Sequence, residues 1–287
     1  MGAIRRFALR QVVLSPRMTT TLTLFEHECQ EFPWSDRDLS LLERLSQSTQ
    51  TDVLKATIRK GKRAIQASQH VGVIRLRNKT IQVLPKVYQA RESDSKQIRT
   101  KEATANLLRM LAYAGELRVR EHELAPLMRQ TDNWFEILTR LFATHLRDEW
   151  QRGAYRTYQS IDDDSPILKG KWRISEQLKH PQRRHLFSVT YDEFSADNSL
   201  NRVFRFVVER LWNLTRDYDN RQILGELRQW MDEVTLKAKI SASDANPSQL
   251  TRLNDRYRPL LKSRSRISRW RSATNGRGRP IYVRLCL

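Results

Sequence analysis

The sequence is poor in cysteine and has no long apolar run. Its 287 residues include two cysteines, Cys29 and Cys286, near opposite ends of the chain. Neither belongs to a CxxC or Cys/His cluster, so we expect neither a disulfide framework nor a zinc site. No apolar stretch approaches the ~20 residues that cross a bilayer, and no small-residue cleavage site follows the basic N-terminus. We therefore expect a cytoplasmic protein that makes no contact with a membrane.

Acidic residues are scarce relative to basic ones. The chain has 52 Lys and Arg against 32 Asp and Glu, which gives a formal net charge of +20. Such a surplus speeds association with polyanions and favours phosphate-rich or acidic partners, without distinguishing DNA, RNA or an acidic protein. Apolar residues make up 39% of the chain and seven residues are tryptophan, so the chain can bury a core.

Catalytic motifs are missing as well. Without a GxxxxGK[ST] loop the chain should not bind GTP itself, and no GxSxG or Cys/His arrangement is present. The D/E-x-K triplet of Mg²⁺-dependent nucleases occurs only at Asp94-Ser95-Lys96, in a hydrophilic segment that we interpret as a solvated loop. The run at 162–164, three aspartates, lacks further ligands at metal spacing, and we interpret it as a solvated acidic turn. We predict no catalytic residue, no metal ligand and no cofactor in this chain.

The N-terminal third is predicted to be a small α+β domain over residues 19–90, preceded by an unstructured basic leader at 1–18. Residues 21–28 alternate polar and apolar side chains, the period of a half-buried strand. Residues 71–87 predict a hairpin that turns at 77–79. Between them we expect a short helix capped by Ser35 or Asp36 and a segment at 52–67 of uncertain type.

The rest of the chain is predicted to be mainly helical. Residues 91–102 are charged and read as a linker, and a helical domain follows at 103–262. A strand-rich β-hairpin or finger at about 153–190 interrupts it. Apolar residues at helical spacing predict helices near 105–115, 133–150, 198–217 and 221–238, and another after Pro247. The fold class is therefore α+β, a small β-rich N-terminal domain followed by a helical domain with an inserted finger.

The last 25 residues, 263–287, change character abruptly. They contain seven arginines and no acidic residue. An arginine-rich arm that folds onto nucleic acid is one interpretation. A frameshifted or truncated end is the other, and we favour it because the resemblance described next stops near residue 262.

Several motifs in a fixed order resemble the McrC family, over roughly residues 20–262. They include LTLFEHE with GVIRLRNKTIQVLPKV, and NLLRMLAYAGEL. Further along stand Arg152-Gly153, Lys169-Gly170-Lys171, and YDEF at 191–194 before the asparagines Asn198 and Asn201. We expect Asp197 to cap the helix that follows, with Phe194 packed against its first turns.

The resemblance implies a function in a 5-methylcytosine-dependent restriction system. In the McrC family the N-terminal part inserts into the pore of a hexameric GTPase, McrB, and stimulates GTP hydrolysis, while GTP is bound by that partner. A C-terminal PD-(D/E)xK nuclease, for which Mg²⁺ is expected, then cuts DNA. This chain shows no such nuclease motif, so we expect a subunit that lacks the cleaving domain.

A basic segment in the finger is the predicted partner-binding site. Its residues are Lys169, Gly170, Lys171, Arg173, Arg183 and Arg184. Gly170 would permit a tight turn, and a cation at the tip would organise the partner's GTPase site from outside. The bland interpretation is an ordinary solvated basic loop.

Two rival hypotheses remain at this stage. One is a free-standing nucleic-acid-binding protein that uses the basic loop and the arginine tail; DNA is an expected partner under both readings. The other is a non-functional fragment whose helices at 198–261 lack the domain that they normally pack against.

Overall fold

A computed structural model describes most of the chain. The described residues are 20–49 without 32 and 34, 54–89 without 77 and 78, 94–113, 133–240 without 239, then 252, 254–258, 260 and 281–284. The predicted leader at 1–18, the turn at 77–78, Gly115 and the segment that follows Pro247 lie outside them, apart from the few residues named at 252–260. No described helix is long and apolar enough to cross a membrane.

A four-stranded sheet forms the centre of the N-terminal part. Its strand order is β1-β6-β5-β10, in which β1 (Thr20–Phe25) runs parallel to β6 (Lys79–Leu84) and antiparallel pairs join the others. β5 (Gly72–Leu76) and β6 form the predicted hairpin, which confirms that prediction. β6 is buried along most of its length, because the sheet is covered on both faces.

β10 (Ile281–Arg284) comes from the tail that we expected to be a frameshifted or truncated end. It pairs antiparallel with β5, with Tyr282 opposite Ile74. This part of the arginine-rich segment is therefore a strand at the edge of the N-terminal sheet.

A second, three-stranded sheet occupies the segment of uncertain type. Its order is β2-β4-β3, with β2 (Cys29–Glu31), β3 (Leu54–Arg59) and β4 (Lys62–Ala67) all antiparallel. Helix α1 (Asp36–Thr49) packs beside it, and its first turn begins directly after Ser35, as predicted. Leu42, Leu54 and Ile65 join the two sheets and the helix in one small core.

Helix α2 (Lys96–Tyr113) begins inside the segment that we predicted to be a linker. The buried face of its first turns consists of small or polar residues, Thr100, Ala103 and Thr104, whereas Ile98 is 55% exposed. A helix with such a face lacks the apolar period that reveals one in sequence. The segment 91–102 is therefore helical from Lys96 onward.

Three longer helices make the second part, in agreement with the predicted fold class. They are α4 (Trp134–Gln151), α6 (Ser199–Leu214) and α7 (Tyr218–Trp230). Each starts at a capping side chain that accepts a backbone N–H: Asn133, Asn198 and Asp217. The predicted cap Asp197 is wrong by one residue, because its carboxylate is bound elsewhere.

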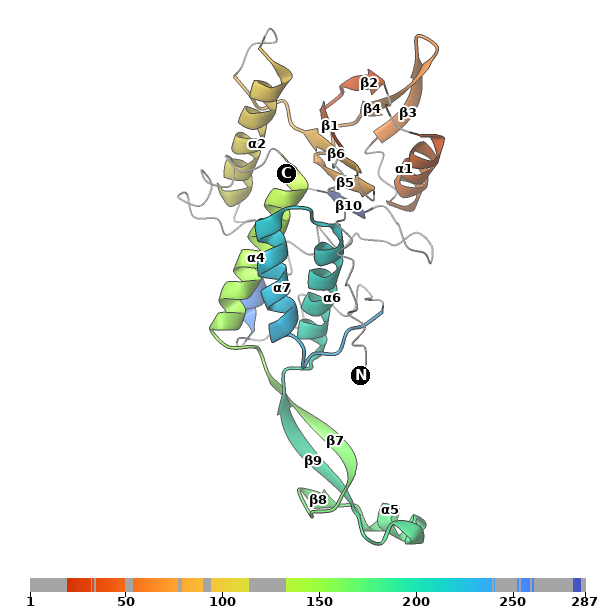
Figure 1. Ribbon diagram of the computed structural model, residues 1–287, viewed down its shortest axis with the longest axis vertical. Coiled ribbons are helices and arrows are strands. Elements are labelled where there is room, and N and C mark those ends of the chain that lie inside the picture. The colour runs from red at the N-terminus through yellow and green to blue at the C-terminus, as the bar shows by residue number, and fades with distance from the viewer. Residues whose placement is uncertain are drawn as a thin grey trace, which may run out of the picture.

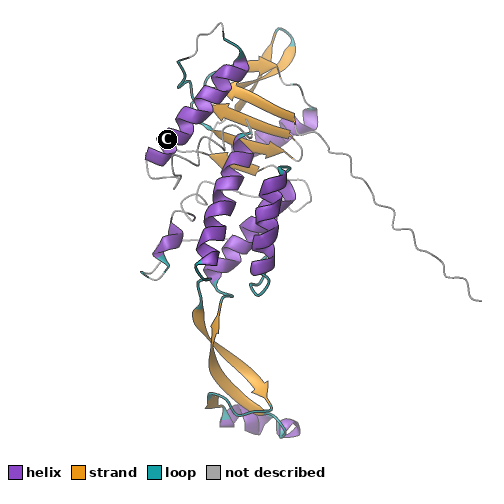
Figure 2. Cartoon of the chain, turned by 60° about the vertical axis from the view of Figure 1, so that its left-hand side comes forward, coloured by secondary structure: helices purple, strands orange, loops and turns teal. Residues whose placement is uncertain are grey.

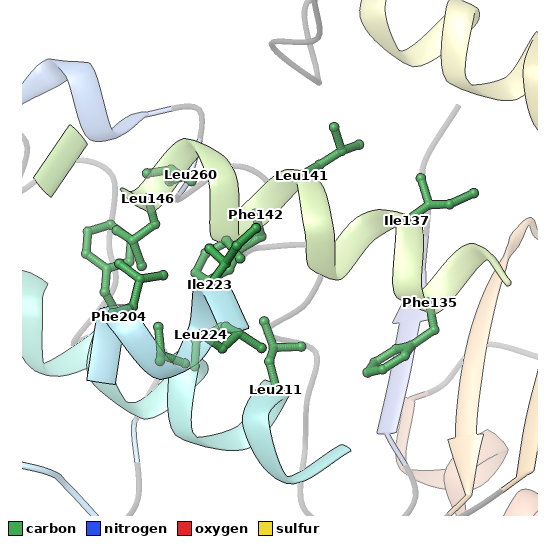
Figure 3. Close-up of a cluster of buried hydrophobic side chains, with 14 of the residues drawn as sticks. Phe135, Ile137, Leu141, Phe142, Leu146, Phe204, Leu211, Ile223, Leu224 and Leu260 are labelled. Carbon is green, nitrogen blue, oxygen red and sulfur yellow. The ribbon is translucent and has the colours of Figure 1, made fainter. Parts of the chain in front are cut away.

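One apolar core joins the helices to the four-stranded sheet. Residues from all three helices converge in it, as Figure 3 shows for Phe142, Phe204 and Leu224. The same cluster includes Val73 and Leu84 of the sheet, and Tyr257 and Leu260 from late in the chain. The two predicted domains therefore share a core. The helices at 198–230 are packed within it, contrary to the fragment hypothesis.

Candidate functional site

The finger is a long two-stranded ribbon that leaves the helical part between α4 and α6. β7 (Thr157–Ser165) and β9 (Phe187–Ser195) pair antiparallel without interruption, from Thr157 opposite Ser195 to Ser165 opposite Phe187. Figure 1 shows the ribbon projecting away from the helices, with its tip at the end of the molecule opposite the N-terminal sheets, and Figure 2 shows the same projection from another side. The predicted finger at 153–190 is therefore present and extends to Ser195.

Two asparagines hold the base of the finger. The side-chain amides of Asn198 and Asn201 both donate to the carbonyl oxygen of Tyr155, at 2.9 and 2.8 Å. Asn201 also donates to the carbonyl oxygen of Ala196, and both asparagines are buried. The strand that enters the finger is thus tied to the helix that leaves it.

Asp197 adds an ionic anchor at the same place. Its carboxylate accepts two hydrogen bonds from Arg202, at 2.7 and 2.9 Å, and two from the backbone and hydroxyl of Thr235. The Arg202 guanidinium, followed by the Thr235 donors, holds the pKa of Asp197 far below its usual range. Because Thr235 follows α7, the base of the finger is bonded to two helices, and the ribbon is held in one direction.

The tip folds back on itself around Gly170. After β7 the chain forms β8 (Lys171–Trp172), which pairs with β9, then α5 (Ile174–Lys179) and a turn of 3₁₀ helix at Pro181–Arg183. Gly170 has φ +66°, and a Cβ there would lie 2.7 Å from the Cβ of Tyr191 and closer still to the carbonyl oxygen of Thr190. The turn that we expected of Gly170 is therefore present, and only glycine fits it.

The three aspartates of β7 bind three of the predicted partner-binding cations. The pairs are Asp162 with Arg173 at 3.0 Å, Asp163 with Lys169 at 3.6 Å and Asp164 with Arg183 at 2.6 Å. The aspartates lie within a strand, so the expectation of a solvated acidic turn is wrong. They neutralise the tip from within, and hydrogen bonds from Ser188 and Arg183 lower the pKa of Asp164.

Lys169 is held twice. Its ammonium lies 3.7 Å from the centroid of the Tyr191 ring and also faces Asp163. The contact with Tyr191, followed by the nearby carboxylate, raises the pKa of Lys169. A lysine fixed in this way supports the fold of the tip.

Two of the predicted cations are left over. Lys171 and Arg184 are exposed, and neither forms an ion pair with any residue that the structure describes. They stand on opposite sides of α5 in the chain, within one small tip. Of the six predicted residues, these two alone have a charge that is not already neutralised in the described tip.

The tip also exposes apolar side chains that sequence reasoning did not single out. They are Ile167, Leu168, Trp172, Ile174 and Leu178, with exposed fractions from 42% to 76%. Solvent-exposed apolar groups gathered at one place mark a surface that another molecule covers. Their signal in the sequence is present but weak, since apolar residues next to a glycine turn read equally well as core strands.

The structure gives no support to a catalytic site in the described part of the chain. Asp94-Ser95-Lys96 opens helix α2, where Ser95 accepts backbone N–H groups and Lys96 binds Glu28 and Gln30. The solvated-loop interpretation of this triplet is therefore wrong, although no nuclease geometry replaces it. The described residues also contain no group of three or more His, Cys, Asp or Glu that could hold a metal ion.

Comparison with known proteins identifies the family. Residues 65–267 match the model of the McrBC 5-methylcytosine restriction system component. The chain belongs to the McrBC family. This match confirms the resemblance found in the sequence, and it spans the four-stranded sheet, the finger and the helices.

Two solved structures of McrBC assemblies are similar to this McrBC family member. One is the refined half-complex of Thermococcus gammatolerans McrB AAA+ hexamers with bound McrC, with a TM-score of 0.67 and 27% identity over 85% of this chain and 63% of that chain. The other is the cryo-EM structure of the Thermococcus gammatolerans McrBC complex, with a TM-score of 0.66 and 28% identity over 85% of this chain and 79% of that chain. The chain thus spans less than two thirds of the first of these relatives. No curated protein sequence matches it.

Proposed function

We propose that this chain is an McrC-type subunit that docks through its finger into a ring-shaped McrB-type GTPase and stimulates GTP hydrolysis. In the full system DNA cleavage would be the task of a separate nuclease domain. The observation that carries the proposal is the finger itself, a ribbon anchored at its base whose tip exposes apolar groups far from the core. The similar solved assemblies, in which McrC is bound to McrB hexamers, support it.

The chemistry of the tip indicates which residues would act on the partner. Arg173, Lys169 and Arg183 are neutralised by the aspartates of β7 and would serve to hold the tip in shape. Lys171 and Arg184 remain as the cations that could reach a GTPase site, where an added positive charge stabilises the transition state. The apolar side chains around them would supply the binding area.

The alternative, a free-standing nucleic-acid-binding protein that uses this basic segment, loses support for the same reason. Three of its five cations are neutralised within the chain, so the segment offers much less charge to a phosphate backbone than its sequence suggests.

The test is the GTP turnover of the cognate McrB-type GTPase with and without the chain. We expect the unaltered chain to raise turnover and to co-elute with the ring. Lys171→Gln with Arg184→Gln should remove most of the stimulation while co-elution persists, because those charges act on the reaction. Ile167→Ser with Leu178→Ser should weaken co-elution, because those side chains supply contact area.

Matched controls lie away from the finger. Lys101→Gln removes an exposed charge from α2, and Tyr218→Ser removes a side chain that is 79% exposed at the start of α7. Neither should change stimulation or co-elution. The proposal fails if the unaltered chain neither binds the ring nor raises its GTP turnover.

A further inference from the structure

The β3–β4 hairpin is the most basic projection in the N-terminal part. Residues 54–67, LKATIRKGKRAIQA, contain five cations and no acidic residue. β2 pairs with β4 only from Ala64 onward, so the end formed by residues 58–63 is two-stranded and projects beyond the sheet. Figure 1 places this hairpin at the end of the molecule opposite the finger.

The turn of this hairpin holds a lysine in a conformation that disfavours it. Arg59 pairs with Lys62, so the turn has two residues, Lys60 with φ +50° and Gly61 with φ +73°. Positive φ at both positions is the type I′ hairpin turn, for which asparagine-glycine is the preferred sequence. A long side chain at the first position is strained, and such outliers concentrate at functional sites. A cation thus occupies the tip where asparagine would fit better.

Cations stand on both faces of the projecting ribbon. Since side chains alternate along a strand, Arg59 and Lys62 share one face, while Arg63 lies on the other beside Ile58. The side chains of Lys62 and Arg63 are 69% and 54% exposed although each meets one carboxylate, from Glu31 and Asp36 respectively. Lys60 forms no ion pair with any described residue.

We propose that the β3–β4 hairpin binds the phosphate backbone of duplex DNA, with its tip in the major groove. A two-stranded ribbon fits the B-form major groove, about 12 Å wide, and cations on its two faces then meet the phosphates of both walls. The major groove of A-form RNA is deep and narrow and does not admit such a ribbon. The side chain of Ile58 is 77% exposed, so no described residue covers this end of the hairpin.

This site is independent of the proposed function, because it lies at the other end of the molecule and involves no GTPase. It would give the subunit a contact with DNA that does not read the base sequence, since only phosphates are bound. Such a contact would hold the duplex beside the N-terminal sheets.

The test is the salt dependence of binding of the full chain to a short fluorescein-labelled unmethylated DNA duplex, followed by fluorescence anisotropy. The variant Arg59→Gln, Lys60→Asn, Lys62→Gln removes three cations and keeps the turn, because asparagine tolerates positive φ. The slope of log Kobs against log salt should become shallower by about 2 to 3, at about 0.9 for each lost phosphate contact. Lys60→Asn alone should account for about 0.9 and leave the melting temperature unchanged or higher.

A charge-matched control separates the site from the general basic character of the chain. Lys86→Gln, Lys101→Gln, Arg109→Gln removes three exposed cations elsewhere in the N-terminal part and should leave the slope near that of the unaltered chain. Equal slopes for the two triple variants would overturn the proposal. So would a hairpin-dependent slope with an RNA duplex that is absent with DNA.

Discussion

The guanidinium of Arg75, on β5, donates a hydrogen bond to the carbonyl oxygen of Leu214 at the last residue of α6, at 3.1 Å. Arg75 is fully buried, and burial lowers its pKa while the charge of Glu136 on α4 acts to raise it. This contact joins the N-terminal sheet to the two helices that carry the finger.

Replacing Arg75 by methionine should lower the free energy of unfolding by about 3 kcal/mol, because Glu136 would remain buried without its positive neighbour. Chemical denaturation measures the change. The exposed control Arg109→Met should change stability by less than about 0.5 kcal/mol. Adding Glu136→Gln to Arg75→Met should cost less than the sum of the single changes, and strict additivity would show that the two charges do not interact.

Gly170→Ala should disrupt the finger tip. The new Cβ would meet the backbone of β9 at a positive φ, whereas the same change at Gly61, also at positive φ, meets no atom within 4 Å. We expect amide hydrogen exchange in β8 and the facing part of β9 to rise at least tenfold in Gly170→Ala, which corresponds to about 1.4 kcal/mol of local stability. In Gly61→Ala the finger should exchange as before; equal protection of the tip in both variants would refute the close approach.

Asp197 should stabilise the fold at neutral pH and lose this effect in acid. Its pKa is lowered on folding, so its contribution is present in full above the unfolded value of about 3.9 and disappears as pH falls toward the folded value. Asp197→Asn should cost about 2 kcal/mol at pH 7, because hydrogen bonds to Arg202 and Thr235 are lost. Urea unfolding at pH 7, 5 and 3 should show the difference from the unaltered chain shrinking only at pH 3; a constant difference would contradict the anchor.

The aspartates of β7 should protect the finger from proteolysis. Changing Asp162, Asp163 and Asp164 to asparagine releases three cations in the tip and leaves them to repel each other. Trypsin should then cleave within residues 169–184 faster, while the free energy of unfolding of the whole chain changes by less than about 1 kcal/mol, since exposed pairs contribute little to stability. The control Asp192→Asn, an exposed aspartate of β9, should leave the cleavage rate unchanged.

The helices of the second part were predictable because each has an apolar stripe. α4 and α6 begin within one residue of their predicted starts at 133 and 198, and the finger between them was anticipated from its strand-like segments and the resemblance. Helix α2 was predicted too short, because its first turns bury threonine and alanine instead of large apolar residues.

The tip of the finger was harder to predict, because its structure depends on contacts across the ribbon. Sequence spacing does not pair Asp164 with Arg183, which lie nineteen residues apart and meet only once β7 and β9 are in register. Helix α5 was missed for a related reason: its apolar residues Ile174 and Leu178 face solvent, so no buried stripe marks it. The basic segment therefore seemed a larger cationic surface than the structure presents.

The pairing of β10 with β5 has a consequence for synthesis of the protein. Residues 77–280 separate the two strands, so a ribosome that adds about 5–20 residues per second reaches β10 roughly 10–40 s after it finishes β5. During that interval the edge of β5 is open to pairing with other chains. The sheet that is first to emerge is thus the last to be completed, and the nascent chain must be kept from aggregating until its final strand arrives.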